Sequence, residues 1–365
     1  METPIRLGLI GCGRIAMAHA AALRSVAEDG LVRVVAAADP DSSGIDTVTS
    51  IVGPIEHRTD DGHAVINDPN VDAVVIITPT RFHREYIAAA AVAGKPVFTE
   101  KPLAPTFDVV RDVVATVHAA GIPTQVGFQS RFHPLVRRIR SMVQDGSAGA
   151  PMAYMLRDDQ FWPAPAIVPG HSEWRSQRSE AGGGALLEHS IHSCDVLSWC
   201  FGPATRVYAS TRSMFGYDVE DVAALTVEHE SGVVGTLISV FNGVQHREER
   251  RLEVFFERAT VEMTSDFLIG APEDSFLVHS GDDEHAVVYE PSEIIAEQFR
   301  ADGFDPERQV WVYQYFAHHA FATALLRGEA PSPNIDDALN AHAMVEAAYR
   351  SAVERRPVDT AELLA

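Results

Sequence analysis

Short apolar runs alternate with helix-patterned segments between residue 5 and about residue 128. The runs are nearly continuous in apolar and β-branched residues, as parallel strands are when helices cover both faces of their sheet. The segments between them repeat apolar residues at helical intervals, and Gly94 and Gly121 follow two of these segments as stop signals. This alternation predicts a doubly wound α/β domain. The expected strands are Ile5–Ile10, Leu31–Ala38, Ala73–Thr78, Val97–Thr99 and Thr124–Phe128, and the expected helices are Ile15–Ala27, Arg84–Ala93 and Asp108–Ala119.

The pattern changes after about residue 150, where longer strand-like runs follow one another. Short turns such as Glu230-Ser231-Gly232 connect them, and one helix, Ala185–Phe201, interrupts them. We expect an α+β domain with a large, mostly antiparallel sheet that is open on one face. Two final helices, Val310–Leu326 and Ile335–Arg355, are expected to pack back against the body. The expected strands are Ala153–Gln160, Arg206–Ser213, Ala223–Glu230, Val233–Phe241, Leu252–Glu257 and Thr260–Met263.

The chain is strongly acidic, with 51 acidic and 29 basic residues and a net charge of −22. Such a charge repels phosphate backbones and anionic lipid surfaces. The one dense basic run, Arg137, Arg138 and Arg140, lies among apolar residues at helical spacing, which favours a solvated helix face over a nucleic-acid contact. We therefore expect neither nucleic acid nor membrane as a partner.

The cysteines and the N-terminal region indicate a cytoplasmic protein. Cys12, Cys194 and Cys200 form neither an even disulfide framework nor a C-x-x-C pair, which fits a reducing compartment. The first strand-like run begins at Ile5, which leaves no room for a signal peptide. The longest small-apolar stretch, Ala88–Gly94, is far shorter than the roughly 20 residues of a bilayer span.

A glycine-rich turn, Gly11-Cys12-Gly13-Arg14-Ile15-Ala16, directly follows the first expected strand and opens a helix. In a G-x-G-x-x-A turn of this kind, Gly11 permits the tight bend, Gly13 allows the backbone to approach a pyrophosphate, and Ala16 lets the helix sit close to it. The second expected strand ends at Asp39, where a carboxylate binds the ribose hydroxyls of NAD. We predict that all six loop residues and Asp39 contact the cofactor; the alternative is that they are turn glycines and an ordinary strand-ending aspartate.

The surroundings of Asp39 favour NAD over NADP. Pro40 and Asp41 follow it, so a 2′-phosphate would meet negative charge and no nearby arginine. Because 365 residues are too long for one ordinary core, we expect an NAD-binding Rossmann domain over 1–128. A substrate-binding and oligomerisation α+β domain is expected over 129–333, and a C-terminal helical segment over 334–365.

Two further stretches carry candidate catalytic groups. Lys101 lies where a parallel strand ends, the edge at which open α/β sheets bind ligands, so its ammonium can stabilise a developing alkoxide; the alternative is a surface lysine before a loop proline. Glu188, His192 and Asp195 follow an i, i+4, i+7 spacing, which predicts one helix face that presents all three. The imidazole of His192 is suited to take a hydroxyl proton near neutral pH. The alternative is a solvated face with local ion pairs.

These motifs together resemble the Gfo/Idh/MocA family, of the glucose–fructose oxidoreductase and inositol dehydrogenase type. The resemblance spans most of residues 5–205. Besides the glycine-rich turn, it rests on Thr78-Pro79-Thr80-Arg81-Phe82-His83, Thr99-Glu100-Lys101-Pro102, Arg131-Phe132-His133-Pro134 and the stretch from Gly182 to Asp195.

The resemblance implies a role for each matching residue. Lys101 is expected to be catalytic, His192 to be the acid/base, and Asp195 to bind substrate or orient the histidine. The family has an aspartate one turn before the histidine, and this chain has Glu188 there, a departure that leaves its assisting role open. Cofactor contacts are further expected from Thr78, Pro79, Thr80, His83, Glu100 and Lys101.

The substrate is expected to be a small polyhydroxylated molecule. Trp162, Trp174, Arg175 and Arg131 are candidates for stacking on it or hydrogen bonding to it, although each is individually compatible with a core or surface role. His189-x-x-His192 suggests a metal pair, but no further ligands follow at a convincing spacing, so we expect no metal.

The favoured function is an NAD-dependent dehydrogenase or reductase that acts on a secondary hydroxyl or keto group of a sugar, cyclitol or glycoside. Two alternatives remain, an enzyme of the same family that cycles NAD to cleave a glycosidic bond, and a non-catalytic nucleotide-sensing regulator. Relatives commonly pair through the open sheet, so a homodimer or homotetramer is expected.

Overall fold

The computed structural model describes residues 3–161, 173–244, 249–265, 271–272, 274–281, 287–307 and 313–364. The chain divides into two compact units. The first unit comprises residues 1–129 and 314–339, and the second comprises residues 130–313 and 340–365.

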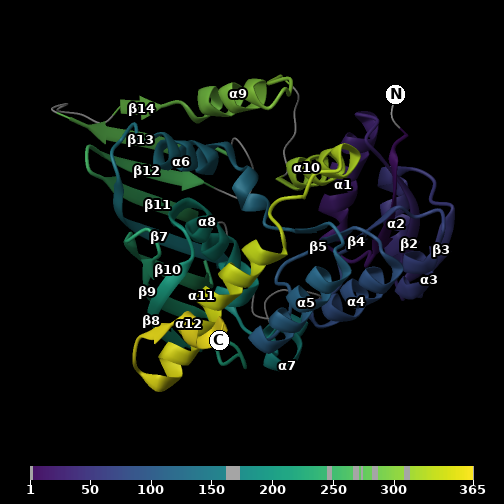
Figure 1. Ribbon diagram of the computed structural model, residues 1–365, viewed down its shortest axis with the longest axis horizontal. Coiled ribbons are helices and arrows are strands. Elements are labelled where there is room, and N and C mark those ends of the chain that lie inside the picture. The colour runs from purple at the N-terminus through teal and green to yellow at the C-terminus, as the bar shows by residue number, and fades with distance from the viewer. Residues whose placement is uncertain are drawn as a thin grey trace. The chain divides into compact units, whose positions relative to one another are not determined.

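The first unit is built on a six-stranded parallel sheet with the order β3-β2-β1-β4-β5-β6 (Figure 1). The strands Ala73–Ile76 and Val97–Thr99 are fully buried, as their largely apolar sequences predict. The strands are β1 (Ile5–Ile10), β2 (Val32–Ala38), β3 (His57–Thr59), β4 (Ala73–Ile76), β5 (Val97–Thr99) and β6 (Thr124–Val126). The helices between them are α1 (Ala16–Glu28), α2 (Ser42–Val52), α3 (Gly62–Asn67), α4 (His83–Ala93) and α5 (Phe107–Ala120). The prediction of a doubly wound α/β domain is confirmed.

A returning helix, α10 (Tyr313–Arg327), corrects the expected domain division, which assigned all of 129–333 to the second domain. From Gln314 onward this segment belongs to the first unit. The Gln125 side chain donates to the carbonyl of Ala317 at 2.8 Å, and the Tyr315 hydroxyl donates to Asp29 at 2.7 Å. These long-range bonds, rather than any local pattern, attach α10 to the Rossmann fold.

The second unit contains a nine-stranded sheet with the order β14-β13-β12-β11-β7-β10-β9-β8-β15. Among the described strand pairs of this sheet, only the pair of β7 and β10 is parallel. The prediction of a mostly antiparallel sheet is therefore confirmed. The strands are β7 (Pro151–Phe161), β8 (Ala204–Arg212), β9 (Val222–His229), β10 (Val234–Asn242), β11 (Glu249–Phe256), β12 (Ala259–Ser265), β13 (Ser275–Ser280), β14 (Val287–Tyr289) and β15 (Val358–Asp359).

Helices cover one face of this sheet and leave the other exposed. Along β10, Leu237, Ser239 and Phe241 are buried, whereas Val234 and Ile238 are exposed. Figure 1 shows α6 (Pro134–Asp145) and α8 (Ile191–Phe201) in front of the sheet. The remaining helices of the chain are α7 (Arg178–Ala181), α9 (Pro291–Ala301), α11 (Ile335–Glu354) and α12 (Ala361–Leu364).

The basic run on α6 is less solvated than its pattern predicts. Arg137 forms an ion pair with Asp302, and Arg140 donates to the carbonyl of Cys200 at 3.1 Å. Both arginines are half-buried, so they attach the helix to its neighbours.

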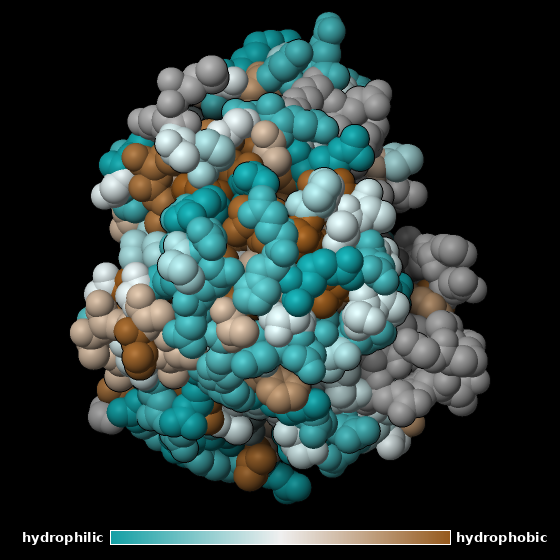
Figure 2. Space-filling model, turned by 90° about the vertical axis from the view of Figure 1, so that its right-hand side faces the viewer, coloured by the Kyte–Doolittle hydropathy of each residue, from teal (hydrophilic) through white to brown (hydrophobic). Residues whose placement is uncertain are grey.

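One face of the surface is mainly hydrophilic. On the face drawn in Figure 2, hydrophobic side chains form small groups separated by hydrophilic ones. Among the described helices, none has the length and apolar composition that crossing a bilayer requires.

Candidate active site

The glycine-rich turn lies at the carboxyl edge of the parallel sheet, between β1 and α1. Gly11 has a φ of +96°, and a Cβ atom there would lie 2.6 Å from the carbonyl oxygen of Ile77. Gly13 differs, because a Cβ atom there would meet nothing within 4 Å. The backbone therefore needs glycine at position 11 to fold, and position 13 faces open space in which a pyrophosphate group fits.

Asp39 braces this turn from the end of β2. Its Oδ2 accepts a hydrogen bond from the Cys12 amide at 2.6 Å, and its Oδ1 accepts one from the Asp41 amide at 2.8 Å. Asp41 in turn caps α2 by accepting from the Ser43 amide at 3.0 Å. A carboxylate has lone pairs beyond these two bonds, so Asp39 can also accept from ribose hydroxyls.

One cation near this carboxylate escaped the sequence analysis. Arg58 on β3 lies opposite Ala37 of β2 in the sheet register, and its guanidinium forms an ion pair with Asp46. The strand that carries Arg58 has no apolar residue, so the hydrophobic pattern gave no signal for it.

Lys101 follows β5 at the same edge of the sheet. The amide of Glu100 donates to the Ile76 carbonyl at 2.9 Å, which continues the pairing with β4 up to the residue before the lysine. The sequence has lysine only at positions 95 and 101, and its other basic residues are arginines. Lys95 donates to the Asp68 carbonyl at 2.6 Å. Lys101 is thus one of two lysines in a chain that otherwise uses arginine. Unlike an arginine, a lysine can exchange its proton.

The neighbouring loop carries other residues that are expected to contact the cofactor. Thr78 and Pro79 are half-buried at the end of β4, whereas Thr80 and His83 are buried. Both ring nitrogens of His83 face backbone carbonyl oxygens, those of Thr78 and Pro102, so this side chain contacts the loops themselves.

In the second unit, the helix expected over 185–201 is interrupted. Residues Ala185–His189 form a π-helical turn, and α8 begins only at Ile191. Glu188 lies in the turn, and His192 and Asp195 lie on α8, so the prediction of one continuous helix face for all three is wrong. A π-helical turn changes the residue spacing, and alternation of apolar and polar residues does not reveal it.

The glycines before this turn are required by close packing. A Cβ atom on Gly184 would lie 1.9 Å from the Glu220 carbonyl oxygen, and one on Gly183 would lie 2.1 Å from the Tyr349 hydroxyl. The Glu220 carboxylate accepts from the amides of Gly184 at 2.9 Å and Leu186 at 3.0 Å. Glycine at positions 183 and 184 therefore lets the backbone pack closely against Tyr349 and Glu220.

A buried carboxylate, Asp158 on β7, connects both sides of the interruption. Its Oδ1 lies 2.9 Å from His189 Nε2, and its Oδ2 accepts from the Ser193 hydroxyl at 2.5 Å. Arg250 Nε lies 3.5 Å from Oδ1. Desolvation acts to raise the pKa of Asp158, but the charges of Arg250 and His189 outweigh it and lower that pKa. Local sequence patterns give no signal for this cluster, because Asp158, His189 and Arg250 lie far apart in the chain.

Two of the expected substrate contacts form a salt bridge with each other. Arg131 binds Asp195 through two hydrogen bonds of 2.7 and 2.6 Å, and both side chains are buried. Such a bidentate pair fixes α8 to the segment before α6. His133 caps α6 by accepting from the Leu135 amide at 3.1 Å, and burial lowers its pKa to about 3.

The remaining candidates gather around Glu188. Arg175 Nε lies 3.5 Å from Glu188 Oε2, and the Arg175 guanidinium lies 5.2 Å from the Trp174 ring centroid. Trp162 lies outside the described residues. The described residues contain no group of three or more His, Cys, Asp or Glu side chains that could hold a metal ion.

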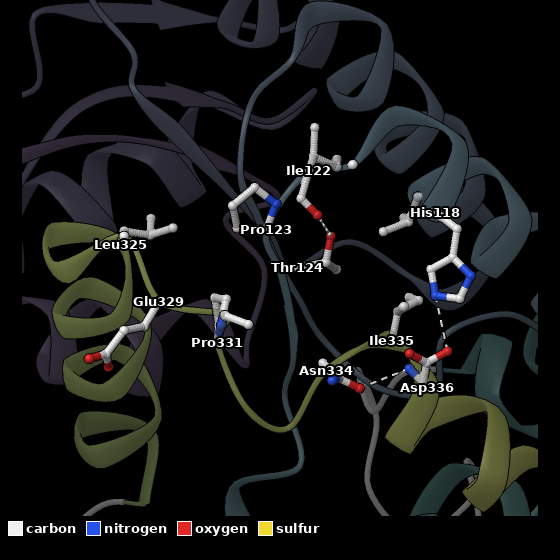
Figure 3. A pocket seen from close by; sticks show the side chains of 14 residues that line it. His118, Ile122, Pro123, Thr124, Leu325, Glu329, Pro331, Asn334, Ile335 and Asp336 are labelled. Atoms are coloured by element: carbon white, nitrogen blue, oxygen red, sulfur yellow. Dashed lines mark hydrogen bonds and ion pairs between the residues drawn. The ribbon is translucent and has the colours of Figure 1, made fainter.

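A cavity of about 500 Å³ also lies in the first unit, between α5, the start of β6 and the segment from α10 to α11 (Figure 3). His118 and Asp336 form an ion pair of 3.0 Å at this cavity. Thr124, the first residue of β6, lines it, so the cavity lies at the amino edge of the parallel sheet. The glycine-rich turn and Lys101 lie at the opposite edge.

Comparison with known proteins matches both halves of the chain to one family. Residues 5–128 match the model of an oxidoreductase family with an NAD-binding Rossmann fold, and residues 136–262 match the GFO/IDH/MocA C-terminal domain. The inositol 2-dehydrogenase of Acidothermus cellulolyticus is 30% identical over 270 residues, which cover 73% of this chain and 74% of that protein. The chain belongs to the Gfo/Idh/MocA family of oxidoreductases.

Other relatives agree with this assignment. The scyllo-inositol 2-dehydrogenase (NAD(+)) of Bacillus subtilis is 32% identical over 243 residues, which cover 64% of this chain and 67% of that protein. A levoglucosan dehydrogenase in complex with NADH superposes with a TM-score of 0.85 at 23% identity, covering 98% of this chain and 99% of that one, and shows the shared fold. The predicted fold class, family and oxidoreductase class are confirmed.

The two glycines of the turn provide a first prediction. Gly13→Ala should keep the wild-type thermal unfolding curve by circular dichroism, because the added methyl group meets open space. It should weaken NADH binding, followed by NADH fluorescence, by about tenfold or more, because the methyl group occupies the phosphate position. Gly11→Ala should instead lower the free energy of unfolding by about 1 to 3 kcal/mol. Equal effects of the two substitutions on NADH binding and stability would contradict these roles.

A second prediction concerns Asp158. Asp158→Asn should lower the free energy of unfolding by about 3 to 5 kcal/mol near neutral pH, because it leaves buried partners without their anion. Since folding lowers the pKa of Asp158, its contribution is complete above the unfolded pKa of about 3.9 and disappears as pH falls further. The difference between wild type and variant should therefore shrink below about pH 4.

Urea unfolding followed by tryptophan fluorescence measures this difference, because all four tryptophans lie in the second unit. Asp145→Asn, at an exposed carboxylate in the last position of α6, is the control and should change little. A destabilisation by Asp158→Asn that stays constant from neutral to strongly acidic pH would show that its charge is not the cause.

Proposed function

We propose that this chain is an NAD-dependent dehydrogenase that acts on a secondary hydroxyl of a sugar, cyclitol or glycoside, or a reductase that runs the reverse reaction. The proposal rests on one observation above all. Lys101 follows β5 of the matched Rossmann domain, and His192 lies in the first turn of α8, directly after the π-helical turn. Relatives named for inositol and D-apiose support the class of substrate.

The residues divide the chemistry between them. NAD, when bound, supplies the hydride acceptor. His192 takes the proton of the substrate hydroxyl, and the Lys101 ammonium stabilises the charge that develops on the same oxygen as hydride leaves the carbon. Glu188, held by Arg175, is suited to accept hydrogen bonds from neighbouring hydroxyls. Asp195 and Arg131 hold α8, and so His192, in place.

We further propose a preference for NAD over NADP. Asp39 and Asp41 present carboxylates at the end of β2, and the nearby Arg58 is engaged by Asp46. A 2′-phosphate would therefore meet negative charge before it met a cation.

The third prediction tests this function directly. Purified protein with NAD or NADP and a panel of sugars, cyclitols and glycosides should produce NADH with at least one compound, and more slowly NADPH. Lys101→Ala and His192→Ala should each lower kcat by about 100-fold or more while the Kd of NADH stays unchanged. Lys95→Ala is the matched control and should retain activity, because Lys95 binds the Asp68 carbonyl.

Other outcomes would point to the alternatives. Cleavage of a glycoside without net NADH would indicate an enzyme that cycles NAD. Tight NADH binding with no turnover of any compound would indicate a regulator. Full activity of Lys101→Ala would remove that lysine from the mechanism.

We also propose a homo-oligomer that pairs through the open sheet. Met155, Tyr208, Val234 and Ile238 lie on β7, β8 and β10, and each is between 43% and 50% exposed. A broad face with this much apolar surface is typical of an interface.

The fourth prediction follows from that face. Ile238→Asp should convert the oligomer to a monomer in light scattering after gel filtration, because a buried, unpaired carboxylate opposes association. Val92→Asp, at a fully exposed valine on α4, is the control and should leave the mass unchanged. A wild-type protein that elutes as a monomer would contradict the proposal.

A cytoplasmic location is also proposed. Cys12, Cys194 and Cys200 are free and buried, and burial raises the pKa of the Cys12 and Cys200 thiols to about 12. Thiols of this kind are typical of a reducing compartment.

A further inference from the structure

Lys101 lies between two residues that are each contacted by a buried histidine from another part of the first unit. His83, at the start of α4, contacts the carbonyl of Pro102. His19, on α1, contacts the carboxylate of Glu100. Both histidines belong to helices that follow the expected cofactor loops, and neither is used by the chemistry proposed above.

His83 joins two loops through one ring. Its Nδ1 lies 2.8 Å from the Pro102 oxygen, and its Nε2 lies 2.9 Å from the Thr78 oxygen. The side chain is only 1% exposed. Burial lowers the pKa of His83, whereas the two carbonyl contacts and the nearby Glu100 carboxylate act in the opposite direction. A neutral imidazole has one N–H, so His83 donates to one of these two carbonyls and lies against the other, and it donates to both only when it is protonated. In either state the ring lies between the residue after Lys101 and the loop after β4.

His19 holds the residue before the lysine. Its Nε2 lies 3.2 Å from Glu100 Oε1, and its Nδ1 lies 2.8 Å from His318 Nε2 on α10. Glu100 Oε2 in turn accepts from the Lys101 amide at 3.3 Å. All three side chains of this chain of contacts are buried.

Charge favours these contacts. Although desolvation acts to raise the pKa of Glu100, contacts with His19 and Lys101 lower it, which favours the carboxylate. Burial lowers the pKa of His318 well below its ordinary value. In the contact between His19 and His318, one ring nitrogen donates and the other accepts.

We propose that His19 and His83 are positioning residues that fix Lys101 by linking it to the two loops expected to hold the dinucleotide. The proposal rests on the catalytic role of Lys101 given above. A lysine side chain is long and flexible, so its reactive position depends on a backbone that does not move. His19 connects that backbone to the helix opened by Gly11–Ala16, and His83 connects it to residues 78–80. Binding of the dinucleotide to either loop therefore affects the position of the Lys101 side chain.

Close packing supports a positioning role over simple space filling. A Cβ atom on Gly127 would lie 2.4 Å from Glu100 Oε1, so the chain leaves room for this carboxylate where a methyl group would block it. A buried charge costs several kcal/mol unless its partners are complete. An apolar residue at position 100 would avoid that cost but would lose the contact with the Lys101 amide.

The fifth prediction uses the two lysines of the chain as probes. Reductive methylation with ¹³C-formaldehyde labels Lys95, Lys101 and the N-terminal amine, and Lys101→Arg assigns the Lys101 signal. In the wild type, NAD alone should shift the Lys101 signal and leave Lys95 in place. In His83→Phe, which keeps a ring of similar size without donors, the Lys101 signal should move in the free protein and respond less to NAD.

Kinetics provides the second readout, with the compound that the wild type turns over fastest in the panel above. His83→Phe should lower kcat by on the order of 100-fold, because a displacement of about 1 Å at a catalytic group has that effect. The Kd of NADH should stay within about threefold, since binding contacts remain. His83→Gln, which retains one donor, should recover part of kcat. His19→Phe should behave like His83→Phe.

His63→Phe is the matched control, because this half-buried histidine pairs with Glu85 on α4. A folded His83→Phe with wild-type kcat and an unmoved Lys101 signal would overturn the proposal. If His83→Phe does not fold, wild-type behaviour of His83→Gln in both readouts would overturn it, and a loss in both would support it. Full activity of Lys101→Ala would instead reject the catalytic role of the lysine. The two results can be separated, because the NMR signal of the labelled lysines is measured without any substrate.

Discussion

The hydrogen bonds that close the carboxyl edge of the parallel sheet are the constraint on which the first unit depends. The strand order places the ends of β2, β1, β4 and β5 next to one another. Strand ends leave backbone groups without a ladder partner, and each buried one needs another. Asp39 provides a partner for the Cys12 amide, and His83 contacts the Thr78 and Pro102 carbonyls. Satisfying these groups also fixes the loops that carry the proposed chemistry.

In the second unit, buried carboxylates provide the partners that buried donors need. Asp158 and Glu220 each contact several donors, Asp195 accepts two hydrogen bonds from Arg131, and all three carboxylates are buried. Burying a charge is stabilising only when its set of partners is complete, so these clusters tolerate little displacement. The result is a rigid setting for the π-helical turn and α8, which carry Glu188 and His192.

The pattern of apolar residues predicted most of the fold because buried strands and amphipathic helices leave a periodic signature. It missed β3, whose three residues, His57–Thr59, are all polar. It also placed α10 in the wrong unit, because Gln125 and Ala317, which join it to the Rossmann fold, lie 192 residues apart. The π-helical turn was missed for a third reason, since its changed spacing breaks the period on which the prediction of one helix face relied.

The sequence by itself determined the order of the elements, the glycine-rich turn, the family and the candidate groups Lys101 and His192. These follow from local spacing and from the chemistry of single side chains. Only the tertiary structure decided which charged groups hold the fold together, such as Arg131 with Asp195, and which histidines surround Lys101. The physical reason is that a buried polar group takes its partner from whichever segment folding brings near, and no local pattern encodes that choice.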